Sequence, residues 1–120
     1  MTEATAKKAA LRKAPAKTDR LVAVLAEVRR TARAIGDLPA ELIGGHFPER
    51  AVENYRKRGE DWHLINRRRE IDERLGMDGL AVQVTFAAFG GRDRAEIREG
   101  LVRLASLAVA AVEWIDREAE

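Results

Sequence analysis

The chain contains no cysteine, which excludes disulfide bridges, thiolate metal sites and cysteine nucleophiles. Aromatic residues make up only 5% of the sequence, a proportion that fits a small helical protein. No run of about 18 apolar residues occurs, so the sequence predicts no membrane span. The basic residues at the N-terminus are not followed by an apolar stretch, which argues against secretion. We therefore expect a cytoplasmic protein.

The residues that are present favour one small helical domain. Of the 120 residues, 46% are apolar and 35% are charged. Ala, Arg, Leu and Glu are prominent, and all four are good helix formers. The net charge of +2 is unevenly placed, because residues 1–17 hold five basic residues against one acidic residue, a net of +4, and residues 18–120 therefore carry −2. We expect a flexible basic arm over residues 1–17 and a single helical domain over residues 18–120.

The arm has no apolar stripe that burial could stabilise, so it is predicted to be flexible. Two interpretations stay open for its charge: a solubilising tail, or an arm that contacts the phosphates of a nucleic acid. The candidate phosphate contacts are Lys7, Lys8, Arg12, Lys13 and Lys17.

Residues 93–120 give the strongest helical pattern. Asp93 with Glu96 three residues later is a capping-box pattern. Apolar residues then recur at three- and four-residue steps in a stripe too wide for one shallow groove. This surplus apolar surface predicts a homo-oligomer or a protein partner. The predicted interface consists of Leu101, Leu104, Leu107, Ala108, Ala111, Trp114 and Ile115.

Two helices are expected in the first half of the chain. The first covers about residues 18–35 and ends at Gly36, which can supply the left-handed conformation of a helix stop. Pro48 suits the first position of the second helix. Gly59 either ends this second helix or bends it.

Two more segments complete the expected fold. A helix over residues 62–75 is predicted to stop at Gly76. Residues 81–86 alternate like a strand, but no second strand is available to pair with them, so we predict a helix over residues 80–89. The predicted fold class is all-α, a bundle of four to five helices with a flexible basic N-terminal arm.

Arginines near helix ends and on one helical face are candidate ligand contacts. Those of the first helix either complement the helix dipole or bind a phosphate. The run of residues 67–69 is interleaved with acidic residues, which is typical of a solvated face, and a nucleic-acid contact is the alternative. The candidates are Arg29, Arg30, Arg33, Arg67, Arg68, Arg69 and Arg103.

No catalytic motif is found. Two histidines without a supporting local context give no catalytic triad, and the HExxH, EF-hand and phosphate-loop patterns are absent. His63, next to Trp62, is interpreted as half of a partly buried structural pair, with stacking on a base or ligand as the alternative. We therefore name no catalytic residue, no metal ligand and no cofactor.

The order of the elements resembles a known family. The segment LVAVLAEVRR at Leu21–Arg30 is similar to an opening helix, and the run from Arg98 to Arg117 is similar to the closing helix, of MazG-like nucleoside triphosphate pyrophosphohydrolases. The resemblance is closest to the short forms found in actinobacteria and their phages. It covers most of residues 21–117 and implies an all-α fold.

The resemblance also implies a set of carboxylates that hold Mg²⁺ and activate water for attack on a triphosphate. In this chain the corresponding positions are Gln83, Val84 and Ala87 on one helix, and Gly100 and Arg103 on the next. None of the five is a carboxylate, and Arg103 places a positive charge where the family places a metal. The expected function is therefore a non-catalytic MazG-like binding protein, for instance a phage accessory or structural protein, that acts on a nucleotide or a protein partner.

Two other functions stay open. The first is a nucleic-acid-associated protein that uses the basic arm and Arg67–Arg69. The second is a divergent Mg²⁺-dependent pyrophosphohydrolase whose ligands come from other acidic residues. Its candidate ligands are Glu53, Glu70, Asp72 and Glu73.

Overall fold

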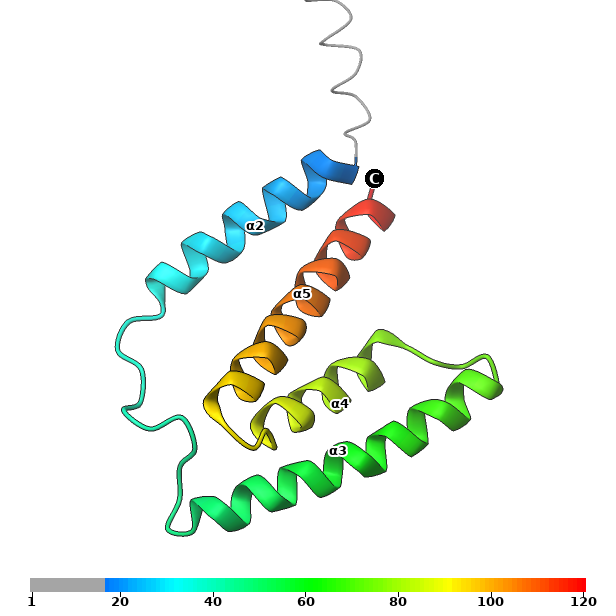
Figure 1. The fold of residues 1–120 in the computed structure, drawn as a ribbon. Coiled ribbons are helices and arrows are strands. Elements are labelled where there is room, and N and C mark those ends of the chain that lie inside the picture. Colours follow the sequence, from blue (N-terminus) through cyan, green and yellow to red (C-terminus); the bar gives the residue numbers. More distant parts are fainter. Residues whose placement is uncertain (1–16) are drawn as a thin grey trace, which may run out of the picture. The chain divides into compact units, whose positions relative to one another are not determined.

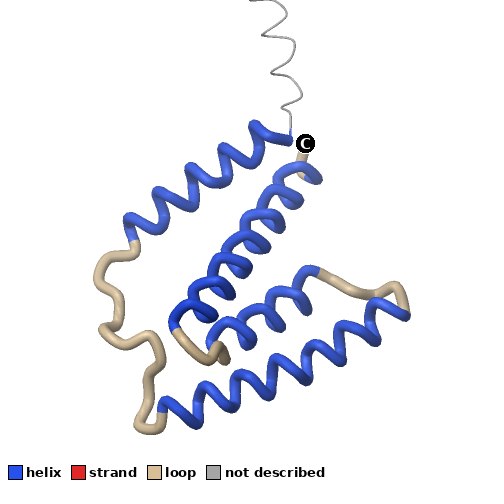
Figure 2. The backbone as a smooth tube through the Cα atoms, viewed as in Figure 1, coloured by secondary structure: helices blue, strands red, loops and turns tan. Residues whose placement is uncertain are grey.

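The computed structural model describes residues 17–120, in which four helices are joined by loops and no strand occurs (Figures 1 and 2). The helices are α2 (Lys17–Ala34), α3 (Pro48–Ile71), α4 (Met77–Phe89) and α5 (Arg94–Glu118). The predicted all-α fold class is confirmed, as is the helix predicted over residues 80–89. The predicted arm lies outside the described residues except for Lys17, which is the first residue of α2.

The described residues form two compact units. The terminal unit comprises residues 17–36 and 109–120, that is α2 and the last turns of α5. The central unit comprises residues 37–108, that is α3, α4 and the first part of α5. The single domain expected over residues 18–120 stays a prediction.

Helix α3 is longer than expected. The structure has one continuous helix from Pro48 to Ile71, so the alternative that Gly59 ends a helix is wrong, whereas the predicted bend there stays a prediction. A Cβ atom on Gly59 would lie 3.3 Å from the backbone nitrogen of Ala87 in α4. Any larger side chain here would make a tight contact with α4, so glycine suits the close approach of the two helices despite its low helix propensity.

The link between α3 and α4 also differs from the expectation. Helix α3 ends at Ile71, and Glu73 then adopts a positive φ of 57°. Gly76, expected as the stop of a helix over residues 62–75, is instead the N-cap residue of α4, with an extended φ of −122°. The acidic residue therefore takes the left-handed turn position that the sequence pattern gave to glycine.

Helix α4 packs between α3 and the first part of α5. Ala88 has no exposed surface, and a Cβ atom on Gly100 would lie 2.6 Å from its Cα atom. On the other side, the Tyr55 ring of α3 lies 6.3 Å from the Phe86 ring and 6.4 Å from the Phe89 ring, measured between centroids. Small residues on one face and aromatic residues on the other thus hold α4 in place.

The start of α5 confirms the predicted cap. The backbone N–H of Glu96 donates to Asp93 Oδ1 at 2.9 Å. The Glu96 carboxylate reaches back to the backbone N–H of Arg92 at 2.7 Å, one residue earlier than in the usual reciprocal pattern. Two amides that the first helical turn leaves without intrahelical partners are thereby satisfied.

In the terminal unit, the start of α2 meets the end of α5. Arg20 Nε donates to Glu120 Oε1 at 3.1 Å. This hydrogen bond raises the pKa of Arg20 and lowers the pKa of Glu120. Val24 and Val109 are buried, and so is Glu113, which pairs with Arg117 at 3.9 Å. Gly36 follows α2 with a φ of +83°, which confirms the predicted left-handed helix stop.

Over residues 17–120, none of the helices combines the length and the apolar character that crossing a bilayer requires.

Candidate ligand-binding groove

A groove of about 800 Å³ lies in the central unit between α3, α4 and the start of α5. Its volume falls in the range of small-molecule sites, roughly 300–1,000 Å³. Residues at three- and four-residue spacings on α3 and on α5 form its two walls, as one face of each helix requires. The lining residues are Arg56, Gly59, Glu60, His63 and Leu64 of α3, Gln83, Val84 and Ala87 of α4, Gly90, Gly91 and Arg92 of the following turn, and Glu96, Glu99, Gly100 and Arg103 of α5.

The floor of the groove is made of small and apolar side chains. Gly59 of α3 and Gly100 of α5 both lie where α4 approaches closely, so neither wall is blocked by a side chain at these points. Val84 and Ala87 of α4 form the base between them. An apolar ring or chain can lie on this floor while polar groups contact the charged rims.

A chain of hydrogen bonds leads from the interior to one wall of the groove. Asn66, which is 5% exposed, donates its Nδ2 to the carbonyl of Gly79 at 2.9 Å and to Gln83 Oε1 at 2.7 Å. The amide nitrogen of Gln83 then lies 3.3 Å from His63 Nδ1. Asn66 thus fixes the orientation of the Gln83 amide, whose nitrogen has one N–H group beyond the one that can bond His63.

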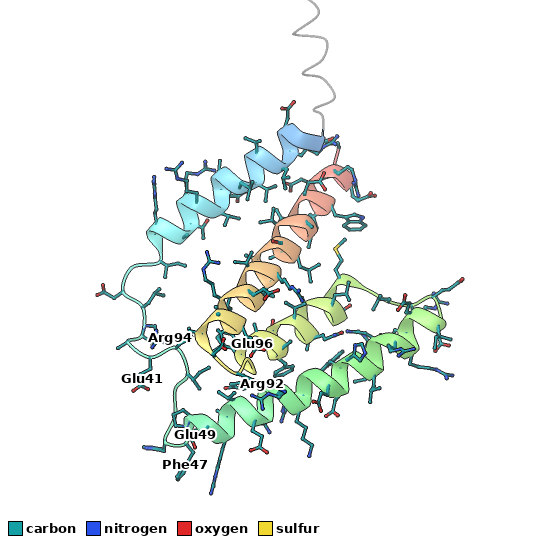
Figure 3. The ribbon with its side chains drawn as sticks, viewed as in Figure 1. Glu41, Phe47, Glu49, Arg92, Arg94 and Glu96 are labelled. Carbon is teal, nitrogen blue, oxygen red and sulfur yellow. The ribbon has the colours of Figure 1, made fainter. Side chains whose placement is uncertain are left out.

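Each of the three arginines that line the groove makes its own contact with a neighbouring residue. Arg56 Nε donates to the carbonyl of Gly90 at 3.0 Å, and Arg103 pairs with Glu99 at 3.1 Å one turn earlier. The backbone N–H of Arg92, in the turn before α5, donates to the carboxylate of Glu96 in the first turn of α5 (Figure 3). Three arginines and three glutamates line the groove, so its charge is balanced rather than uniformly positive.

The five positions that the MazG resemblance assigns to metal ligands all line this groove. Gln83, Val84 and Ala87 come from α4, and Gly100 and Arg103 come from α5. Residues 17–120 contain no group of three or more His, Cys, Asp or Glu side chains placed to hold a metal ion. The alternative ligands Glu53, Glu70, Asp72 and Glu73 do not line the groove.

Of the seven candidate arginines, Arg103 lines the groove, and those of residues 67–69 lie elsewhere on α3. Arg68 pairs with Asp72 at 3.2 Å. Arg69 lies over the Trp62 ring at 5.3 Å and 3.8 Å from Asp78. These contacts fit the predicted solvated face with local ion pairs.

The remaining candidates lie in other places. Arg29, Arg30 and Arg33 are exposed on α2, in the terminal unit. Lys7, Lys8, Arg12 and Lys13 lie outside the described residues. The predicted pairing of His63 with Trp62 is wrong, because His63 is exposed in the groove and Trp62 is covered by Arg69.

The predicted interface residues of α5 are unevenly covered. Trp114 is 44% exposed and Ile115 is 59% exposed. Ala108 is exposed as well, whereas Leu101, Leu104, Leu107 and Ala111 are half-buried. A second, more apolar cavity of about 460 Å³ in the central unit is lined by Leu42, Arg94, Ile97, Arg98, Leu101, Val102 and Ala105.

Sequence reasoning missed Arg56, Arg92 and the polar pair Asn66–Gln83 as parts of a site. Arg56 and Arg92 lie 36 residues apart and line the same groove because α4 folds back on α3. Asn66 and Gln83 have no spacing signal between them. A helical-face plot of α3 could have placed Arg56, Glu60 and His63 on one face, but not opposite a particular helix.

Comparisons of the chain with protein-family models, with curated proteins and with solved structures find no match.

Proposed function

We propose that this protein is a non-catalytic, MazG-like binding protein whose groove takes a nucleotide without hydrolysing it. The observation that carries the proposal is the convergence of Gln83, Val84, Ala87, Gly100 and Arg103 on one groove that lacks a carboxylate cluster. A pyrophosphohydrolase needs a metal to bridge the phosphates and activate water, and these five side chains offer it no ligand set. A phage-encoded accessory role in the cytoplasm agrees with this proposal.

The groove offers a different set of contacts for a nucleotide. Arg103, Arg92 and Arg56 can donate to phosphate oxygens, and the oriented amide of Gln83 adds neutral donors. The base can lie on Val84 and Ala87. Because Arg103 pairs with Glu99 in the free protein, phosphate must compete with that carboxylate, so we expect moderate affinity.

Calorimetric titration with a panel of nucleoside triphosphates tests this function. We expect binding that persists in EDTA, and no release of pyrophosphate when Mg²⁺ is added. Arg103→Glu should weaken binding by at least about tenfold, because it removes a charged donor and adds repulsion. Arg98→Glu, on the same helix but outside the groove, is the matched control and should bind like the wild type.

Two outcomes would overturn parts of this proposal. Mg²⁺-dependent pyrophosphate release that is lost in Glu70→Gln or Glu73→Gln would establish the divergent enzyme instead. If no nucleotide binds, a nucleotide is not the ligand of the groove. Steeply salt-dependent DNA or RNA binding that is lost on deletion of residues 1–17 would favour the nucleic-acid function.

We also propose that the protein associates with itself. The support is the large apolar surface left exposed on α2 and α5, including Val22 at 60% and Ile115 at 59%. Side chains of this size on neighbouring helices are stabilised when a second surface covers them.

A further inference from the structure

The hydrogen bonds that lead from Gly79 to the groove have a fixed direction. A backbone carbonyl can only accept, so the Asn66 atom that lies 2.9 Å from the Gly79 oxygen must be the amide nitrogen. That nitrogen carries a second hydrogen, which it donates to Gln83 Oε1 at 2.7 Å. Turning the Asn66 amide over would set its oxygen against the Gly79 carbonyl. One backbone group therefore settles the orientation of both side-chain amides.

The same direction settles where the neutral His63 ring carries its proton. With its oxygen held by Asn66, Gln83 turns its nitrogen toward His63, 3.3 Å from Nδ1. An N–H group needs an acceptor, so Nδ1 is the acceptor and the proton lies on Nε2. His63 is exposed and lines the groove. The α3 side of the groove thus presents N–H donors at this level, and the acidic Glu60 of the same wall lies about one turn earlier on α3.

These donors lie beside the floor on which a base would rest. Gln83 and Val84 are consecutive in α4, and both line the groove. Consecutive side chains of a helix point about 100° apart, so a base that lies on Val84 has Gln83 at its edge rather than beneath it. The edge of the base that faces α3 therefore meets donors.

We infer that the groove selects nucleotides whose base carries a keto oxygen at this edge and discriminates against bases that carry an amino group there. The inference rests on the proposed nucleotide function and names the class of base. Guanine, hypoxanthine and uracil have a carbonyl oxygen where adenine and cytosine have an NH2 group. A keto oxygen accepts from the Gln83 amide, whereas an amino group sets donor against donor. A free glutamine could turn its amide over to suit either base, but Asn66 and Gly79 prevent this turn.

Calorimetric titration of the full chain in EDTA with two matched pairs of nucleotides tests the inference. Inosine triphosphate is compared with adenosine triphosphate, and uridine triphosphate with cytidine triphosphate. In each pair we expect the keto nucleotide to bind at least about tenfold more tightly, because the amino group leaves donors without an acceptor. The ratio within a pair is the readout, since contacts with the phosphates are common to both members.

Substitutions of Gln83 should change these ratios in different directions. Gln83→Glu should reverse both preferences, because a carboxylate still accepts from Asn66 but offers the groove an acceptor. Gln83→Leu should bring both ratios close to one. Glu99→Gln, which changes a charge on the opposite wall, is the control and should shift all four affinities by a common factor. Circular dichroism checks that each variant is helical, and Gln83→Met replaces a Leu variant that is not.

Nitrogen NMR of the imidazole rings measures the hydrogen-bond chain without a nucleotide. At about pH 8, where imidazole side chains are neutral, His63 should carry its proton on Nε2. His63→Gln identifies its signals, because the sequence has two histidines. A proton on Nδ1, equal binding within both pairs, or a keto preference that persists in Gln83→Glu would overturn this inference alone. If none of the four nucleotides binds, the proposed function and this inference both fail.

Discussion

Asn66 of α3 holds Gln83 of α4 through a hydrogen bond of 2.7 Å from its side-chain amide to Gln83 Oε1. The same amide also bonds the carbonyl of Gly79, so one buried side chain fixes two points of the neighbouring helix. This contact links the packing of the central unit to the groove, because Gln83 is a lining residue.

Asn66→Ala is expected to destabilise the protein by about 1–3 kcal/mol, because it leaves the Gly79 carbonyl and the Gln83 amide without their buried partner. Urea unfolding followed by circular dichroism measures the change. Asn54→Ala on the same helix is the control, since Asn54 is exposed and bonds only Arg58, and it should change stability by less than about 0.5 kcal/mol. Equal effects of the two substitutions would contradict the role given to Asn66.

Gly100→Ala is expected to destabilise the protein by about 1–3 kcal/mol, although alanine favours a helix by about 1 kcal/mol. The added methyl would lie 2.6 Å from Ala88 Cα, so α4 and α5 must move apart. Thermal unfolding checks the change. Gly44→Ala is the control, because nothing lies within 4 Å of its added methyl and its φ is not positive. A Gly100→Ala protein as stable as the wild type would show that the two helices are not closely packed.

Glu73→Gly is expected to stabilise the protein by about 0.5–1 kcal/mol. Glu73 has a φ of 57°, a backbone conformation that is strained for a residue with a Cβ atom and unstrained for glycine. The reverse change, Gly36→Ala at a φ of +83°, should destabilise by about 1 kcal/mol without any steric contact. Chemical denaturation of both variants compares the two positions. The same sign of effect at both would be inconsistent with this turn geometry.

The Arg20–Glu120 pair is expected to make stability depend on pH in the acid range. The hydrogen bond from Arg20 lowers the pKa of Glu120 in the folded protein. A lowered carboxyl pKa contributes stability that is present above the unfolded pKa and is lost as the pH falls through the folded pKa. Glu120→Gln should therefore melt below the wild type near neutral pH and together with it in strong acid. A melting difference that persists in strong acid would contradict this explanation.

The sequence by itself determined where most helices lie and how several of them end. The three- and four-residue spacing of apolar residues in α5, the Asp93–Glu96 cap and the left-handed Gly36 are local features, and local geometry decides them. The helix at residues 80–89 could also be predicted, because a single strand would have left its backbone groups unpaired.

The tertiary structure alone decided which faces meet. Glycine is locally favoured just after a helix end and disfavoured in a helix interior, yet Gly59 lies inside α3, where a Cβ atom would come within 3.3 Å of the backbone nitrogen of Ala87. The groove likewise depends on Arg56, Gln83 and Arg103 coming together from three helices. Periodicity fixes the face of a helix on which a residue lies, but the helix opposite that face is chosen by packing between residues far apart in the chain, which leaves no spacing signal in the sequence.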